Sequence, residues 1–292
     1  LQTGVKLMTE IPKSQILWRP SPERLETANI TRFIHYLQNE RGVDVPDYPA
    51  LYEWSVQQTQ EFWVSVWEFC GIRAQGDLAP VVLNEQQMPG AQWFPNIRLN
   101  FAQNLLRFKD ERIAIVGIDE LGERRSWSYA QLHDAVAALA AKLRELGIGP
   151  NDRVAALMPN VPETLIAMLA SVSLGAVWTS CSPDFGVQGI LDRFGQVQPK
   201  LMFSTDGYRY GGKSFDSLAK VAALLPQIDS VQHVIVVPHV LPAAQISFDM
   251  LGEKSSIAMY FDDAAVAGVP LQFAHLPFDH PLYILYSSGT TG

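Results

Sequence analysis

The chain ends in a run of hydroxyl residues and glycines with no charged side chain, and this run has the composition of an anion-binding loop. It consists of Ser287, Ser288, Gly289, Thr290, Thr291 and Gly292. Glycines let consecutive backbone N–H groups turn toward one anion, and Ser and Thr hydroxyls add donors, so the run can wrap a polyphosphate. It is not the Walker pattern, which places four residues between its first glycine and a Gly-Lys pair. A tight polar turn after a strand is the alternative interpretation.

A second candidate follows the apolar run at residues 201–204. Its residues are Tyr208, Arg209, Tyr210, Gly211, Gly212 and Lys213. An arginine offers a fork of N–H donors and a lysine offers a point charge, so Arg209 and Lys213 could close on one phosphate. The two tyrosines could stack on a base. The alternative is a flexible glycine-rich surface loop whose charges are solvated.

Composition excludes several classes of protein. The 292 residues carry 22 Lys and Arg against 30 Asp and Glu, a net charge of −8, which argues against nucleic-acid and membrane partners. The apolar run at 165–178 is too short to span a bilayer, and the first ten residues contain no signal-peptide pattern. Cys70 and Cys181 lie in apolar settings, so we expect buried reduced thiols and a cytoplasmic location. The histidines have no metal-ligand spacing, so we expect no metal site within the chain.

The order of apolar segments predicts the architecture. Residues 1–110 are aromatic-rich and helical in pattern, and residues 113–129 read as a strand pair around a glycine-containing turn. Ser128 and Gln131 form a capping box for the helix that follows. Strand and helix patterns then alternate: we expect strands at 154–158, 176–180, 201–204, 231–237 and 281–286, and helices at 162–174, 190–197 and 217–225.

This alternation predicts an α/β fold, a doubly wound and mostly parallel sheet flanked by helices, preceded by a helical aromatic-rich extension. We expect the extension at residues 1–110 and an incomplete α/β domain at 111–292 that ends inside the phosphate loop. Such sheets bind ligands beyond the carboxyl ends of their strands. The loops after Met158, Ser180, Ser204 and Tyr286 are therefore the expected sites.

The run at 287–292 resembles the phosphate loop of the adenylate-forming acyl-CoA synthetases, in which the loop continues into a Pro-Lys pair. The resemblance covers most of the chain from about Trp18 and is greatest to the branch that activates acetoacetate. It rests on residues 17–24, 28–33, 93–106, 180–186 and 282–292. The resemblance implies two steps: a carboxylate attacks ATP to give an acyl-adenylate and pyrophosphate, and the thiol of coenzyme A then takes the acyl group.

The resemblance also implies roles for individual residues. The run at 287–292 would hold the β- and γ-phosphates of ATP. Arg209, Gly211, Gly212 and Lys213 match an Arg-Gly-Gly-Arg-like patch that holds the 3′-phosphate of coenzyme A, with Lys in place of one Arg and one extra residue. In relatives, the ligands of Mg²⁺, the groups that bind adenine and ribose, the adenylation lysine and the acid pocket lie beyond the position of Gly292.

We therefore expect an amino-terminal part of such an enzyme, with no catalytic residue of its own and no activity alone. Its partners would be acetoacetate, ATP, coenzyme A and Mg²⁺, together with the missing carboxy-terminal part. Two alternatives remain. One is a different acyl-CoA synthetase or adenylation domain. The other is a naturally short, non-catalytic protein that binds a nucleotide or a partner through its sheet edge.

Overall fold

A computed structural model describes residues 18–266 and 268–287. The chain forms two compact units, residues 1–72 and 73–292. The second unit begins before the expected boundary at residue 110, because the segment after Ile72 is tied into the α/β fold. The buried Asn100 amide donates hydrogen bonds to the carbonyls of Val172 (3.0 Å), Ser173 (3.1 Å) and Ala274 (2.9 Å). The division of the whole protein into domains stays a prediction.

The first unit is helical, as its sequence pattern indicates. Its helices are α1 (Pro22–Glu26), α2 (Asn29–Glu40), α3 (Tyr48–Gln57) and α4 (Thr59–Cys70). Helices α2, α3 and α4 surround a small core of Phe33, Leu37, Val45 and Leu51, against which further aromatic side chains pack. Cys70 is exposed at the end of α4, so its expected burial is wrong.

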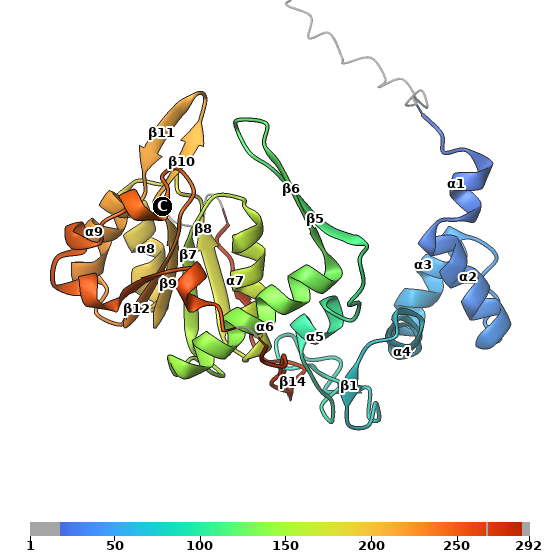
Figure 1. Cartoon of the computed structure of the whole chain (residues 1–292). Helices are drawn as coiled ribbons and strands as arrows, with labels where there is room; N and C mark the ends of the chain where they lie inside the picture. Colours follow the sequence, from blue (N-terminus) through green and yellow to red (C-terminus); the bar gives the residue numbers. More distant parts are fainter. Residues whose placement is uncertain (1–17, 267, 288–292) are drawn as a thin grey trace, which may run out of the picture. The chain divides into compact units, whose positions relative to one another are not determined.

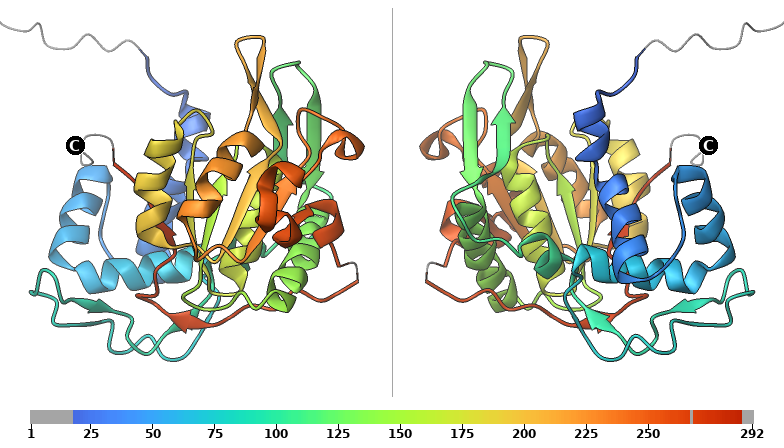
Figure 2. Two further views of the ribbon diagram at one scale, coloured as in Figure 1. Left: turned by 90° about the vertical axis from the view of Figure 1, so that its left-hand side faces the viewer. Right: turned by 90° about the vertical axis from the view of Figure 1, so that its right-hand side faces the viewer.

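The second unit is built on a six-stranded parallel sheet. Its strands, in spatial order, are β13 (Ala258–Tyr260), β12 (His233–Val237), β9 (Leu201–Thr205), β7 (Arg153–Leu157), β8 (Val177–Cys181) and β15 (Tyr283–Ile284). Helices α6 (Tyr129–Glu145) and α7 (Pro162–Ser173) cover one face, and α8 (Val187–Val197) and α9 (Leu218–Leu224) cover the other (Figure 2). Each face of the sheet has its own hydrophobic core. Along β7, Ala156 belongs to the core under α6 and α7, and Leu157 belongs to the core under α8 and α9. The doubly wound fold predicted from the alternation is confirmed.

Two antiparallel hairpins project from one end of this unit (Figure 1). The first pairs β5 (Ile113–Ile118) with β6 (Arg124–Ser128), and the second pairs β10 (Gly207–Tyr210) with β11 (Lys213–Asp216). The predicted capping box starts α6, since the Gln131 N–H donates to the Ser128 hydroxyl at 3.2 Å and the Ser128 N–H donates to the Gln131 side chain at 2.8 Å.

Short elements complete the unit. They are β1 (Ala74–Gln75), β4 (Arg98–Leu99) and β14 (Leu276–Pro277) in one sheet, β2 (Val82–Leu83) paired with β3 (Gln92–Trp93), helix α5 (Phe101–Leu105), and the 3₁₀ turns η1 (Leu225–Gln227), η2 (Ala243–Gln245), η3 (Asp249–Ile257) and η4 (Asp262–Ala264). Within the residues described, no helix is both long enough and apolar enough to cross a bilayer.

The predicted buried strand at 281–286 is shorter and more exposed than expected. Only Tyr283 and Ile284 pair with β8, and the side chain of Leu285 is 77% exposed. β15 is an edge strand that contains only Tyr283 and Ile284, so it has a neighbouring strand on one side and Leu285 lies beyond its paired residues. The prediction of a strand is confirmed, whereas the prediction of its burial is wrong.

Candidate functional site

A cleft of about 670 Å³ opens at the carboxyl ends of the central strands, where the fold class places ligands. Its walls come from the loops after β7, β8 and β12, from strand β10, and from the β5–β6 hairpin. The loops after Met158 and Ser180 line it as predicted, and the segment after Ser204 contributes β10. The described residues of the fourth predicted loop, Tyr286 and Ser287, are not among those that line it.

The predicted coenzyme A segment is a hairpin and not a flexible loop. Gly211 and Gly212 form its turn, with φ of +57° and +75°, values that residues with a Cβ rarely adopt. Cross-strand partners share a face of a hairpin, and successive pairs alternate between the two faces. Arg209 pairs with Ser214 and Tyr210 pairs with Lys213, so the two cations project from opposite faces. The structure does not bring Arg209 and Lys213 together, and their role as ligands stays a prediction.

Arg209 lines the cleft and is held by its wall. Its Nη1 donates to the His239 carbonyl at 3.2 Å and its Nη2 to the Val240 carbonyl at 3.0 Å. These bonds use two of the five N–H donors of a guanidinium, so donors remain for a ligand phosphate. Lys213 is exposed on β11 and does not line the cleft.

The two tyrosines of β10 differ in their surroundings. Tyr208 is buried and stacks on Phe215, with ring centroids 5.0 Å apart. Burial and the Asp184 carboxylate raise the pKa of its hydroxyl. Tyr210 is 65% exposed at the rim of the cleft, so its ring remains accessible for stacking on a base.

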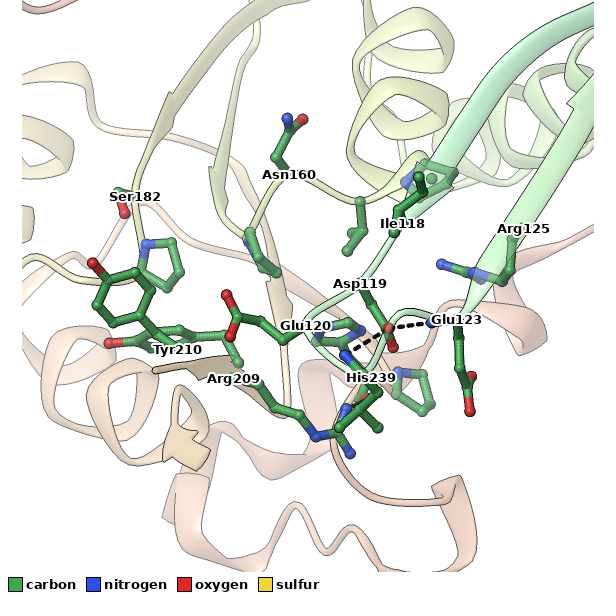
Figure 3. Close-up of a pocket in the computed structure, with 18 of the residues that line it drawn as sticks. Ile118, Asp119, Glu120, Glu123, Arg125, Asn160, Ser182, Arg209, Tyr210 and His239 are labelled. Carbon is green, nitrogen blue, oxygen red and sulfur yellow. Dashed lines mark hydrogen bonds between the residues drawn. The ribbon is translucent and has the colours of Figure 1, made fainter. Parts of the chain in front are cut away.

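The opposite side of the cleft is acidic. Asp119, Glu120 and Glu123 come from the β5–β6 turn and lie around the cleft with Arg209 and His239 (Figure 3). The Asp119 carboxylate accepts hydrogen bonds from the N–H groups of Leu121 (2.9 Å) and Glu123 (2.8 Å), so it shapes the turn. Glu120 and Glu123 are exposed.

Two contacts fix the acidic hairpin to helix α7. Arg125 binds Glu163 through two hydrogen bonds of 2.6 and 3.0 Å, and this contact raises the pKa of Arg125. Glu163 lies in the first turn of α7, where a negative charge is favoured by the helix dipole. A Cβ on Gly117 would lie 2.9 Å from Cγ of Pro162, so the hairpin backbone packs directly on the helix start.

His239 follows β12 and is partly buried in the cleft wall. Burial lowers the pKa of His239, and the nearby Arg209 guanidinium lowers it further. We expect a neutral imidazole at neutral pH, one that can accept or donate a single hydrogen bond to a ligand.

The entry to the predicted phosphate loop is anchored to the sheet. The Thr179 hydroxyl lies 3.0 Å from the Ile284 carbonyl and 3.1 Å from the Tyr286 hydroxyl. The Arg193 guanidinium lies over the rings of Phe185 (4.3 Å) and Tyr286 (5.4 Å). Ser287 is exposed, and Ser288, Gly289, Thr290, Thr291 and Gly292 lie outside the described residues, so the phosphate-binding role of this loop stays a prediction.

Two parts of the cleft are not predicted as functional by the sequence. The pattern at 119–123 predicts only a turn, and His239 has no metal-ligand spacing. The sequence does carry a local signal for the turn, since three of its five residues are acidic. Among the residues described, no three His, Cys, Asp or Glu side chains are grouped to hold a metal ion.

The fold and the cleft define a doubly wound α/β unit with a candidate ligand site at the carboxyl edge of its sheet. Residues 101–292 match the AMP-binding enzyme family, and residues 48–105 match the acetyl-coenzyme A synthetase N-terminus. The chain belongs to the AMP-binding enzyme family.

Its relatives include several synthetases. An acetoacetyl-coenzyme A synthetase of Rhizobium meliloti (strain 1021) is 42% identical over 278 residues, covering 94% of this chain and 42% of that relative. A malonamoyl-CoA synthetase of Penicillium aethiopicum is 36% identical, covering 95% of this chain and 39% of that relative. The solved acetoacetyl-CoA synthetase of Streptomyces lividans matches with a TM-score of 0.84 and 39% identity, covering 96% of this chain and 42% of that structure. This chain thus spans about 42% of the length of the acetoacetyl-CoA synthetases that it resembles.

Proposed function

We propose that this chain is the amino-terminal part of an ATP-dependent acid–CoA ligase. The reaction converts acetoacetate, ATP and coenzyme A into acetoacetyl-CoA, AMP and pyrophosphate through an acyl-adenylate. The observation that carries the proposal is the 36–42% identity to acetoacetyl-CoA synthetases over 94–98% of the chain. A cytoplasmic location belongs to the same proposal.

In this proposal the cleft takes the nucleotide end of coenzyme A. Arg209 offers its remaining N–H donors to the 3′-phosphate, and the exposed ring of Tyr210 is available to stack on adenine. Lys213 contributes charge from the other face of the hairpin, without the forked geometry of an arginine. The residues at 287–292 hold the β- and γ-phosphates of ATP, and the ligands of Mg²⁺ lie beyond Gly292.

The reaction is tested with a protein extended to the length of the relatives. We expect AMP formation that requires acetoacetate, and much slower formation with acetate, propionate or malonamate. The 292-residue chain, assayed in parallel, should form no AMP, because the acid pocket and the adenylation lysine are expected outside it. Equal rates with all four acids would reject acetoacetate as the preferred substrate. AMP formation by the 292-residue chain would reject the proposal that the acid pocket and the adenylation lysine lie outside it.

The coenzyme A site is tested with a matched pair of ligands. Dephospho-CoA lacks only the 3′-phosphate, so its affinity relative to coenzyme A isolates the contacts of that group. A charge-assisted hydrogen bond contributes about 1.5–3 kcal/mol, or about 10- to 150-fold in affinity. Arg209→Ala should weaken coenzyme A by this factor and leave dephospho-CoA nearly unchanged. Equal weakening of both ligands would show that Arg209 does not contact the 3′-phosphate.

A further inference from the structure

A buried carboxylate stands behind the loop that holds Arg209. Asp206 is 6% exposed and lies between β9 and β10. It accepts hydrogen bonds from three consecutive backbone N–H groups, those of His239 (2.6 Å), Val240 (3.0 Å) and Leu241 (2.9 Å). These bonds satisfy the charge of a carboxylate that burial would otherwise make costly.

The same loop presents its carbonyl groups to Arg209. The His239 and Val240 carbonyls accept the two hydrogen bonds from the guanidinium. The loop after β12 is therefore held between an anion that binds its N–H groups and a cation that binds its carbonyls. Both charges come from one short segment, at the end of β9 and the middle of β10.

We propose that Asp206 is a positioning residue for Arg209. By fixing the N–H groups of residues 239–241, it orients the two carbonyls that hold the guanidinium at the cleft wall, and the remaining donors of Arg209 then face the ligand. The effect on ligand binding rests on the proposed coenzyme A role of the cleft, whereas the effect on the loop does not.

Loss of the charge should release the loop. In Asp206→Asn one carboxylate oxygen becomes an NH₂ group, which cannot accept a hydrogen bond from the backbone N–H that now faces it. A purely structural Asp206 would stabilise the fold without any specific effect on Arg209. Two measurements separate these roles, and the first needs no ligand.

The first measurement is hydrogen exchange of the backbone N–H groups of residues 239–241, read by mass spectrometry in the full-length protein. We expect Asp206→Asn to accelerate exchange there by about tenfold or more, the equivalent of one or two hydrogen bonds. The matched control is Asp216→Asn, because the Asp216 carboxylate accepts its hydrogen bond from the Ala219 N–H, whereas the N–H groups of residues 239–241 donate to Asp206. Unchanged exchange in Asp206→Asn would overturn the proposal. If that variant does not fold, Asp206→Glu replaces it, since this change keeps the charge and displaces the carboxylate. Asp206→Glu should accelerate exchange by a smaller factor, and unchanged exchange in Asp206→Glu would likewise overturn the proposal.

The second measurement is the affinity for adenosine 3′,5′-bisphosphate, by calorimetry, in a double-mutant cycle. Asp206→Asn and Arg209→Ala should each weaken binding by about tenfold, and the double variant should bind no more weakly than Arg209→Ala alone. Fully additive losses would show that Asp206 acts independently of Arg209 and would overturn the proposal. Failure of the unmodified protein to bind the bisphosphate would reject the proposed ligand, while the exchange result would still decide the role of Asp206 in the loop.

Discussion

The junction between strand β8 and the predicted phosphate loop depends on one buried hydroxyl. Thr179 is fully buried, and its hydroxyl contacts the Ile284 carbonyl and the Tyr286 hydroxyl. A carbonyl can only accept, so Thr179 donates to Ile284 and Tyr286 donates to Thr179. Thr179→Val keeps the shape of the side chain and removes both hydrogen bonds.

The size of the effect follows from the shortness of β15. This strand pairs with β8 at only two positions, so the side-chain bonds are a large part of what holds it. A hydrogen bond contributes about 0.5–1.5 kcal/mol net. Ile284 and Tyr286 are partly exposed, so in Thr179→Val water can take up part of the hydrogen bonding that their oxygen atoms lose. We expect Thr179→Val to weaken the local closure of β15 by about 1–2 kcal/mol, or about 5- to 30-fold in the opening equilibrium.

Hydrogen exchange of a peptide that covers residues 280–287 measures this opening. Thr179→Ser keeps the hydroxyl and serves as the control, and Tyr286→Phe removes one of the two bonds and should give a smaller acceleration. If the 280–287 peptide exchanges at the same rate in Thr179→Val, in Thr179→Ser and in the unmodified protein, the hydroxyl does not stabilise the pairing of β15. The anchoring of the loop would then have to come from the stacking on Arg193.

Two further predictions concern the walls of the cleft. Gly117→Ala places a Cβ 2.9 Å from Pro162 and should lower the free energy of unfolding, measured in urea, by about 1–3 kcal/mol. Gly149→Ala is the control, because nothing lies within 4 Å of its Cβ, and it should lower that free energy little. Equal losses in the two variants would exclude the close contact as the cause. The pKa of His239 is lowered in the fold, so the stability it contributes is present above its unfolded pKa of about 6.5 and is lost as the pH falls toward the folded value. His239→Asn should therefore flatten the fall in the free energy of unfolding as the pH drops below about 7, and an unchanged slope would contradict this.

The sequence could predict the layers of the fold because their signals are local. The capping box of α6 uses side chains three residues apart, and each strand and helix of the sheet is a contiguous pattern. The β10–β11 hairpin could also have been predicted, since two adjacent glycines between short strands are a hairpin signal. The exposure of β15 could not, because it depends on which strand lies at the edge.

The site was less accessible to sequence reasoning because its contacts join distant segments. Arg209 and Lys213 are close in sequence, yet the register of the hairpin sends them to opposite faces. Asp206 finds its partners more than thirty residues later, across an intervening helix. The residue type makes Arg209 a candidate hydrogen-bond donor to a phosphate, but only the structure shows which of its N–H groups the cleft wall already uses.

The charges of the cleft also determine how a phosphate-bearing ligand would enter. The acidic side belongs to a hairpin that is fixed to α7 by the Arg125–Glu163 pair, so its exposed carboxylates cannot be displaced without cost. Glu120 and Glu123 repel a phosphate, whereas Arg209 on the other side attracts it. A ligand with a phosphate at one end is therefore oriented by repulsion as well as by attraction. In the proposal made above, the buried Asp206 supports Arg209 through the loop at residues 239–241, and so it would affect a ligand that it does not contact.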